Sequence, residues 1–208
     1  MKKILCFGDS NTWGYNPVTK DRYSDNVRWT GILQKKLSEY DISVVEEGLC
    51  GRTTVFEDRV RPGRKGIDAI LPLIFKNSDV DGAIIMLGTN DCKTFYNATA
   101  KQVAEGVRGC LERLKKYLPA GNILLISPIA LGADVWREEF DPEFSPESVL
   151  VSKELPEEYL KVANSEKVHF LAASDYAFPS REDNEHLNVE GHRALAEAVF
   201  KKVCELCA

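Results

Sequence analysis

The stretch ILCFGDSNTWG, residues 4–14, gives the first indication of the fold. Its first four residues are apolar without interruption, which is typical of a strand buried on both faces of a parallel sheet. Gly8, Asp9 and Ser10 follow at once, so small and polar groups stand at the carboxyl end of this strand. In open sheets built from alternating strands and helices, ligand sites lie beyond that end. The stretch therefore predicts a central strand followed by a turn that is a candidate for chemistry.

The same strand pattern recurs along the chain, with helical patterns between the strands. Further apolar runs occur at residues 42–45, 83–87, 123–126 and 168–171, and helices are expected at 27–40, 67–75, 100–118 and from about 189 onward. Thr99 is a suitable N-cap for the third helix, and Pro119 with Gly121 is expected to end it. This alternation predicts an α/β fold, a three-layer α/β/α arrangement around a five-stranded parallel sheet in the flavodoxin-like order 2-1-3-4-5. The 208 residues are expected to form a single domain.

The composition argues against several classes of protein. A net charge of −5 does not suit a general nucleic-acid binder, which carries a basic surface. No apolar run approaches the length of a membrane span, and the apolar run behind Lys2 and Lys3 is too short for a signal peptide. We therefore expect a cytoplasmic protein with no nucleic-acid and no membrane partner.

The six cysteines have irregular spacing, which does not suit a disulfide framework. Cys204 and Cys207 form a Cys-x-x-Cys pair near the C-terminus. Without a second pair or nearby histidines, such a pair is a weak zinc signal, and its place on an expected helix favours thiols that bind no metal. The sequence thus predicts no metal site.

Two segments are unusually charged. Residues 52–65 hold five basic side chains against Glu57 and Asp58, and residues 134–158 hold nine acidic side chains against Arg137 and Lys153. The region of about 131–158 is longer than an ordinary connection, so we expect an acidic loop. It either acts as a lid or packs as a surface excursion. A homo-oligomer is an open expectation, with subunit contacts at residues 52–65.

Polar or small residues follow the first three strands: Ser10, Gly51 and Asn90. If the strand order is 2-1-3-4-5, Ser10 and Asn90 lie side by side at the crevice, and Gly51 lies on the far side of Ser10. Each residue alone has a structural explanation, since Ser10 could cap a helix, Asn90 could cap a turn and Gly51 could supply a positive φ. Their convergence on one sheet edge favours a functional site.

Asp183 and His186 complete a candidate catalytic set. Residues three apart in a helical turn face the same way, so the carboxylate can accept a hydrogen bond from one imidazole nitrogen while the other points outward. A carboxylate placed in this way fixes the tautomer and stabilises the imidazolium, as a serine nucleophile requires. His192 lies within the last expected helix and is interpreted as structural, and His169 lies within a strand and is expected to be packed.

Four short motifs span nearly the whole chain: Gly8-Asp9-Ser10, Gly51, Gly88-Thr89-Asn90-Asp91 and Asp183-x-x-His186. In their order and spacing they resemble the SGNH (GDSL-type) hydrolase family. One departure is Asn11, where the family often has leucine. Residues 9–14 and 47–54 also resemble the branch that includes arylesterases and an acyltransferase able to work in water.

The resemblance implies a role for each residue of the site. Ser10 would be the nucleophile, and His186 would be the general base, oriented by Asp183. The oxyanion hole would consist of the backbone N–H groups of Ser10 and Gly51 and the side-chain amide of Asn90. The implied function is that of a serine esterase, which transfers the acyl group of a small ester through an acyl-serine, normally to water. No cofactor is implied.

The substrate and two other functions remain open. Trp13, Tyr15 and Phe95 are candidates for the walls of the substrate pocket, although each could equally be a packing aromatic. A carbohydrate O-deacetylase or a thioesterase would use the same machinery. A non-catalytic, phosphate-binding flavodoxin-like module would hold a phosphate at residues 8–12. Against that last alternative, the chain has no dinucleotide-binding or P-loop pattern, and such a module has no need of Asp183 and His186.

Overall fold

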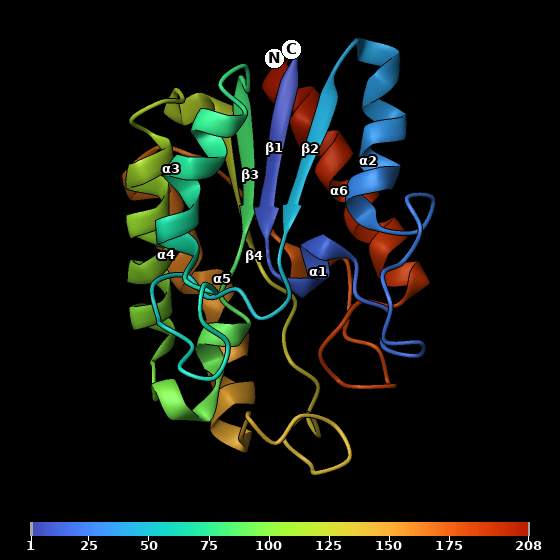
Figure 1. Ribbon diagram of the computed structural model, residues 1–208, viewed down its shortest axis with the longest axis vertical. Coiled ribbons are helices and arrows are strands. Elements are labelled where there is room, and N and C mark those ends of the chain that lie inside the picture. The colour runs from blue at the N-terminus through green and yellow to red at the C-terminus, as the bar shows by residue number, and fades with distance from the viewer. Residues whose placement is uncertain (1, 208) are drawn as a thin grey trace.

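The computed structural model describes residues 2–207, with side chains through Glu205. Its sheet has five parallel strands in the order β2-β1-β3-β4-β5, which confirms the predicted topology (Figure 1). The strands are β1 (Lys3–Gly8), β2 (Ser43–Gly48), β3 (Gly82–Met86), β4 (Ile123–Ser127) and β5 (His169–Ala172). All their carboxyl ends meet at one edge of the sheet, where the short helix α1 (Ser10–Trp13) leaves β1.

The longer helices cover both faces of the sheet. They are α2 (Trp29–Leu37), α3 (Gly66–Lys76), α4 (Ala100–Leu114), α5 (Pro146–Glu166) and α6 (Val189–Cys207). Helices α3, α4 and α5 lie on one face, and α2 and α6 lie on the other (Figure 1). Short 3₁₀ turns occupy Ser38–Tyr40, Asn90–Cys92, Thr94–Tyr96, Ala120–Asn122 and Ala173–Asp175. Cys204 and Cys207 both lie on α6, but the side chain of Cys207 is outside the described residues.

Alternate side chains of each central strand enter opposite layers of the core. In β1, Leu5 and Phe7 face the α3–α5 layer, whereas Ile4 and Cys6 face the α2–α6 layer. Successive side chains of a strand point to opposite faces, so a sheet covered on both sides requires apolar residues at every position. This requirement explains why the strands appear in the sequence as uninterrupted apolar runs.

The ends of two helices differ from the sequence prediction. Thr99 forms the expected capping box with Gln102, but α4 ends at Leu114 rather than near residue 118. The chain then continues in tight turns, in which the N–H groups of Tyr117 and Leu118 bond to the carbonyl of Leu114. Pro119 and Gly121 therefore lie beyond these turns and do not themselves end the helix. The helix expected at 27–40 is α2, which tightens into a 3₁₀ turn after Leu37.

The expectation of an acidic loop over residues 131–158 was wrong in its second half. Helix α5 begins at Pro146, with Ser145 as its N-cap, and continues to Glu166. Proline suits the first helical position because its missing N–H has no intrahelical partner there. Pro156 removes one backbone hydrogen bond in the interior, and the buried face around Leu155 and Tyr159 compensates for that loss. Only residues 131–145 are irregular.

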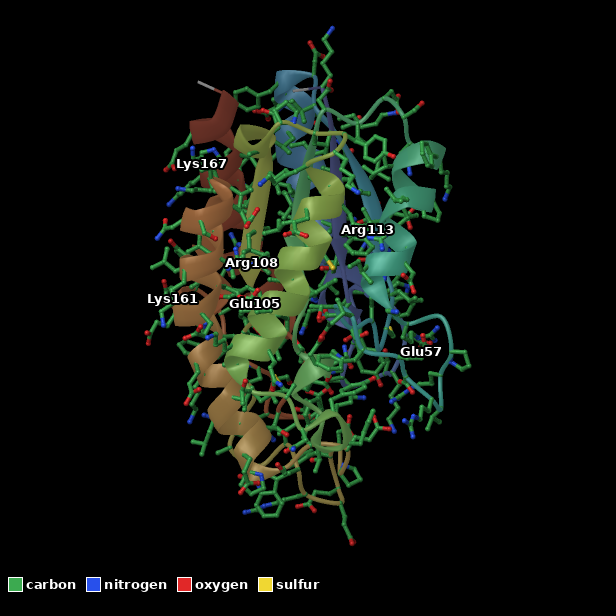
Figure 2. The ribbon with its side chains drawn as sticks, turned by 90° about the vertical axis from the view of Figure 1, so that its left-hand side faces the viewer. Glu57, Glu105, Arg108, Arg113, Lys161 and Lys167 are labelled. Carbon is green, nitrogen blue, oxygen red and sulfur yellow. The ribbon has the colours of Figure 1, made fainter. Side chains whose placement is uncertain are left out.

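Helix α5 also carries charged residues on its outer side. Figure 2 shows α4 and α5 side by side, with Glu105 and Arg108 on α4 and Lys161 on α5. Arg108 bridges Glu105 on its own helix and Glu166 at the end of α5. Four of the nine acidic side chains of residues 134–158 therefore lie on this helix, and the other five lie in the irregular part before it.

The irregular part of the acidic segment is bound to the basic one by an ion pair. Arg61 bonds Asp58 on its own segment and Glu143 across the gap, the latter with Nη2 and Oε2 2.6 Å apart. Glu143 also accepts from the buried ammonium of Lys93, which lies over the ring of Phe144. Because Phe144 is part of the main core, this loop is packed onto the domain near the carboxyl ends of the strands.

Replacement of Tyr159 by Phe tests how α5 supports that sheet edge. The Tyr159 hydroxyl donates to the carbonyl of Leu87 at 2.8 Å, next to Gly88, where an added Cβ would lie 2.3 Å from the same hydroxyl. Tyr159→Phe leaves a buried carbonyl without a donor, so we expect urea denaturation to show a loss of about 1–2 kcal/mol in the free energy of unfolding. Tyr117→Phe, at an exposed tyrosine, is the matched control. Equal effects of the two substitutions would contradict this role.

Candidate active site

The turn after β1 places Ser10 at the start of a helix. Asp9 is the N-cap of α1, and its Oδ1 accepts the N–H of Asn11 at 3.0 Å. Ser10 is therefore the first helical residue. The alternative that Ser10 caps the helix does not hold, because Asp9 is the cap. A Cβ on Gly8 would lie 2.0 Å from Oγ1 of Thr12 and 2.7 Å from the carbonyl oxygen of Met86. Only glycine allows strand and helix to approach so closely at this point.

Ser10, His186 and Asp183 form a hydrogen-bonded relay. Nε2 of His186 lies 2.8 Å from Oγ of Ser10, and Nδ1 lies 2.6 Å from Oδ2 of Asp183. Because an ionised carboxylate only accepts, Nδ1 carries the proton and Nε2 is free to accept from the serine hydroxyl. The other carboxylate oxygen of Asp183 accepts the backbone N–H groups of Glu185 and His186. The three side chains thus have the geometry of a nucleophile, a base and an orienting acid.

The turn that brings Asp183 to His186 is not helical. Asn184 has a φ of 59°, in the left-handed region, and its carbonyl accepts the N–H of Gly132 at 2.7 Å. The sequence argument used helical spacing, which gave the correct pairing through a different backbone conformation. The left-handed residue bends the chain so that Asp183 bonds both the backbone and the ring of His186.

The electrostatics of the relay favour a charged histidine. Burial disfavours the imidazolium, but the carboxylates of Glu185 and Asp183 outweigh it and raise the pKa of His186 above its ordinary value. Burial likewise opposes ionisation of Asp183, yet the hydrogen bond and the charge of His186 lower the pKa of that carboxyl. A base of this kind holds its proton to a higher pH than a solvated histidine does.

Three potential hydrogen-bond donors lie at the ends of β1, β2 and β3. Among the described residues, the backbone N–H groups of Ser10 and Gly51 have no hydrogen-bond acceptor. Gly51 adopts a φ of 80°, a conformation that strongly favours glycine. Asn90 is buried, and one N–H of its amide donates to the carbonyl of Arg52 at 3.2 Å. The second N–H of that amide remains available to a bound group.

Arg52 is a structural residue of this site that the sequence reasoning missed, because it was counted among the basic residues of 52–65. Its guanidinium is buried over the ring of Phe7 and donates to the carbonyls of Gly8 and Glu47. Burial lowers the pKa of Arg52 to about 10. By bonding the last residues of β1 and β2, the side chain fixes the turn that carries Gly51.

Asp91 holds the turn after β3 in a similar way and was also missed as a site residue. Its carboxylate is buried and accepts both the backbone N–H and the hydroxyl of Thr54. Burial raises the pKa of Asp91 to about 7. These bonds join the segment that carries Asn90 to the segment that carries Gly51. The sequence did give a signal for Asp91, because this acid directly follows Asn90, the candidate oxyanion donor.

Asn11 joins the nucleophile turn to the histidine turn. Its Oδ1 accepts the N–H of Leu187 at 2.9 Å, and its carbonyl accepts the indole N–H of Trp29 at 3.1 Å. The residue that departs from the common family pattern therefore fixes Ser10 relative to His186. His192 lies nearby, fully buried, with its Nδ1 3.3 Å from the backbone N–H of Trp29.

The candidate pocket aromatics differ in their surroundings. The ring of Tyr15 packs against His186, with centroids 4.4 Å apart. Trp13 is half-buried and lies under the guanidinium of Arg22. Phe95 is 53% exposed and packs against Tyr96. The structure thus places Tyr15 directly beside the relay, whereas it gives Trp13 and Phe95 other neighbours.

Two kinds of feature are absent from the described residues. No group of three or more His, Cys, Asp or Glu side chains there is arranged to hold a metal ion. Within the same residues, no helix has the length and apolar character needed to cross a membrane.

Known proteins share both the sequence pattern and this architecture. The sequence profile of the GDSL-like lipase/acylhydrolase family matches residues 6–194. The chain belongs to this family. A search of curated proteins found no significant match. Among solved structures, the aryl esterase of M. smegmatis is 32% identical, with a TM-score of 0.91 over 99% of this chain and 100% of that chain.

Other solved structures extend the family likeness. A carbohydrate acetylesterase from Sinorhizobium meliloti is 31% identical, with a TM-score of 0.89 over 99% of this chain and 100% of that chain. A lipase/acylhydrolase from Enterococcus faecalis shares the fold at 18% identity, with a TM-score of 0.71 over 98% and 95% of the two chains. The SGNH resemblance drawn from the four motifs is therefore confirmed.

His192 gives a pH-dependent test of the packing behind the site. Burial lowers the pKa of His192 to about 3, whereas an unfolded histidine titrates near 6.5. Between these values the unfolded chain binds the extra proton, so this group's contribution to stability is complete above pH ~6.5 and is lost as pH falls. We expect His192→Gln to reduce the slope of unfolding free energy against pH by an amount that grows below pH 6.5 and approaches about 1.4 kcal/mol per pH unit near pH 5.

Urea denaturation at several pH values measures that slope. The control is His169→Gln, which also removes a histidine, from the half-buried start of β5. Identical slopes for the wild type and His192→Gln would mean that His192 is not held neutral by burial.

Proposed function

We propose that this family member is a serine esterase, which hydrolyses carboxylic esters of small substrates through an acyl-serine intermediate. The observation that carries this proposal is the continuous relay from Ser10 through His186 to Asp183, with 2.8 Å and 2.6 Å between the bonded atoms. A phosphate-binding module has no need of such a relay. The SGNH family and its esterase relatives add support.

In the acylation step, Oγ of Ser10 attacks the carbonyl carbon of the ester while Nε2 of His186 takes the hydroxyl proton. The carbonyl π electrons move to oxygen and give a tetrahedral oxyanion. Asp183 stabilises the imidazolium through its hydrogen bond to Nδ1. When the intermediate collapses, the bond to the leaving oxygen breaks, and His186 gives its proton to the departing alcohol.

Deacylation repeats these steps with water. His186, now neutral, takes a proton from water as the water oxygen attacks the acyl-serine carbonyl. Collapse of the second tetrahedral intermediate releases the carboxylic acid and returns the proton to Oγ of Ser10. An alcohol that replaces water at this stage receives the acyl group, so the same mechanism includes acyl transfer.

The developing oxyanion is assigned to the N–H groups of Ser10 and Gly51 and to the amide of Asn90. The two backbone donors have no acceptor of their own among the described residues. Donors that are already in place do not have to reorganise when the charge appears, which makes them effective in catalysis. Arg52 and Asp91 hold these donors in position through the bonds described above.

Three classes of substrate are candidates for this site. Relatives at similar identity include an aryl esterase and a carbohydrate acetylesterase, so aryl esters and acetylated sugars are the first candidates. Thioesters are a further class that the same steps would hydrolyse. Tyr15 is the aromatic assigned to the pocket wall, because it packs on His186. The expected cytoplasmic location and homo-oligomer stay predictions.

Substitution of Ser10 tests the proposed activity. We expect Ser10→Ala to lower kcat about 10⁴- to 10⁶-fold on a panel of p-nitrophenyl esters, acetylated sugars and acyl-thioesters. A fluorophosphonate probe should label the wild type and not the variant, since only an activated serine reacts. The Tm should stay within a few degrees, because Ser10 contributes little to packing. Substantial activity in Ser10→Ala would show that the nucleophile lies elsewhere.

Substitution of Asn90 tests the oxyanion assignment. Its amide should bond the oxyanion better than the ground-state carbonyl, so Asn90→Ala should lower kcat about 10²- to 10³-fold and change KM little. Loss of the bond to the Arg52 carbonyl should also reduce stability by about 1 kcal/mol. Asn122→Ala is the control, because that amide donates to the carbonyl of Asp81 at the opposite end of the sheet. An unchanged kcat in folded Asn90→Ala would contradict the assignment.

A further inference from the structure

We propose that Glu185 is a second carboxylate of the relay: it is ionised when the enzyme works and acts as a positioning residue that stabilises the imidazolium of His186 without a hydrogen bond to the ring. This inference rests on the proposed function, in which His186 is the general base. It starts from one distance, 3.8 Å between Oε2 of Glu185 and Nδ1 of His186, on the same ring nitrogen that Asp183 bonds at 2.6 Å.

The backbone holds Glu185 in this place from both sides. Its N–H donates to Oδ1 of Asp183 at 3.0 Å, and its carbonyl faces the side-chain amide of Asn11 at 3.5 Å. Asn11 follows Ser10 directly, so the nucleophile turn and Glu185 are fixed relative to one another. The side chain has little freedom to turn outward, since only 9% of it is exposed.

The groups around the Glu185 carboxylate come from five segments of the chain. They are Asp183 and His186 on its own turn, Tyr15 and Cys50 after β1 and β2, Lys93 after β3, and Asp141 in the irregular acidic segment. Burial raises the pKa of Glu185, and Asp141 and Asp183 add to that effect, whereas His186 and Lys93 favour the ionised form. Lys93 forms ion pairs with Asp141 and Glu143 of the acidic segment.

A charge at this position acts at the catalytic step. When Ser10 attacks, the proton moves to Nε2 and the ring becomes positive. A nearby negative charge in a poorly solvated site stabilises that ring more than it would in water. Asp183 supplies the hydrogen bond that orients the ring, and Glu185 supplies additional charge. The raised pKa of His186, to which the charge of Glu185 contributes beside the hydrogen bond and charge of Asp183, agrees with this division of roles.

Glu185→Gln keeps the size of the side chain and removes its charge. An opposite charge within about 4–6 Å commonly shifts a pKa by 1–3 units. We therefore expect the pKa of His186, followed by NMR of its ring, to fall by about one unit in the variant. The acidic limb of kcat/KM for p-nitrophenyl acetate should move down by the same amount, and kcat on the plateau should fall about 3- to 30-fold.

Two further variants separate charge from structure. Glu182→Gln removes an exposed carboxylate from the same turn and should move neither readout. Glu185→Asp keeps the charge and should shift the pKa of His186 by less than Glu185→Gln does. A purely structural role for Glu185 would change Tm and leave the ring titration in place.

An unchanged His186 titration in Glu185→Gln overturns the proposal. A measurement on the wild type covers the case in which that variant does not fold. The ¹³C shift of the Glu185 carboxyl should titrate at lower pH than the His186 ring. A Glu185 carboxyl that is still protonated where His186 titrates also overturns the proposal. Activity that survives Ser10→Ala would instead refute the proposed function, and the ring titration would still report on Glu185.

Discussion

The parallel pairing of β1 with β2 on one side and β3 on the other is the constraint on which the rest of this structure depends. The register places Gly8 opposite Gly48 and opposite Met86, so the three strands end at the same level. Every group assigned to the reaction, apart from those on the turn of residues 183–186, follows one of those three ends. A shift of one residue in either pairing would move the donors by about 3.3 Å and turn the strand's side chains to the other layer.

Buried polar contacts then fix the loops beyond the strands. Arg52 bonds carbonyls at the ends of two strands, and Asp91 bonds the backbone of Thr54. A buried charge is costly unless it is hydrogen-bonded, so these groups accept few other arrangements. The same logic applies to Asn11, whose bonds join the start of the chain to a turn 176 residues away. The supporting bonds of the site thus join separate segments and restrict their relative movement.

The histidine turn shows how local and distant influences combine. Asp183 reaches His186 through a bend at the left-handed Asn184, which is a local effect of the backbone. The electrostatics of the ring also involve Glu185, whose surroundings extend to Lys93 and the acidic segment. Glu143 pairs both with this Lys93 and with Arg61 of residues 52–65. Through Asp141 the acidic segment belongs to the electrostatic environment of the relay.

The sequence by itself determined the five strands and their order, because a sheet covered on both faces needs uninterrupted apolar runs, and the alternation with helices allows few topologies. It also indicated Ser10, Asn90, Asp183 and His186, since their motifs stand where strands end. It did not predict α5, where Pro146, Pro156 and many acids masked a buried face that only packing against the core stabilises. Nor did it predict the places of Arg52, Asp91 and Glu185. The tertiary structure decided these places. The role of a buried polar side chain depends on its hydrogen-bond partners on other strands and loops, and no local sequence pattern shows which partners the fold brings to it.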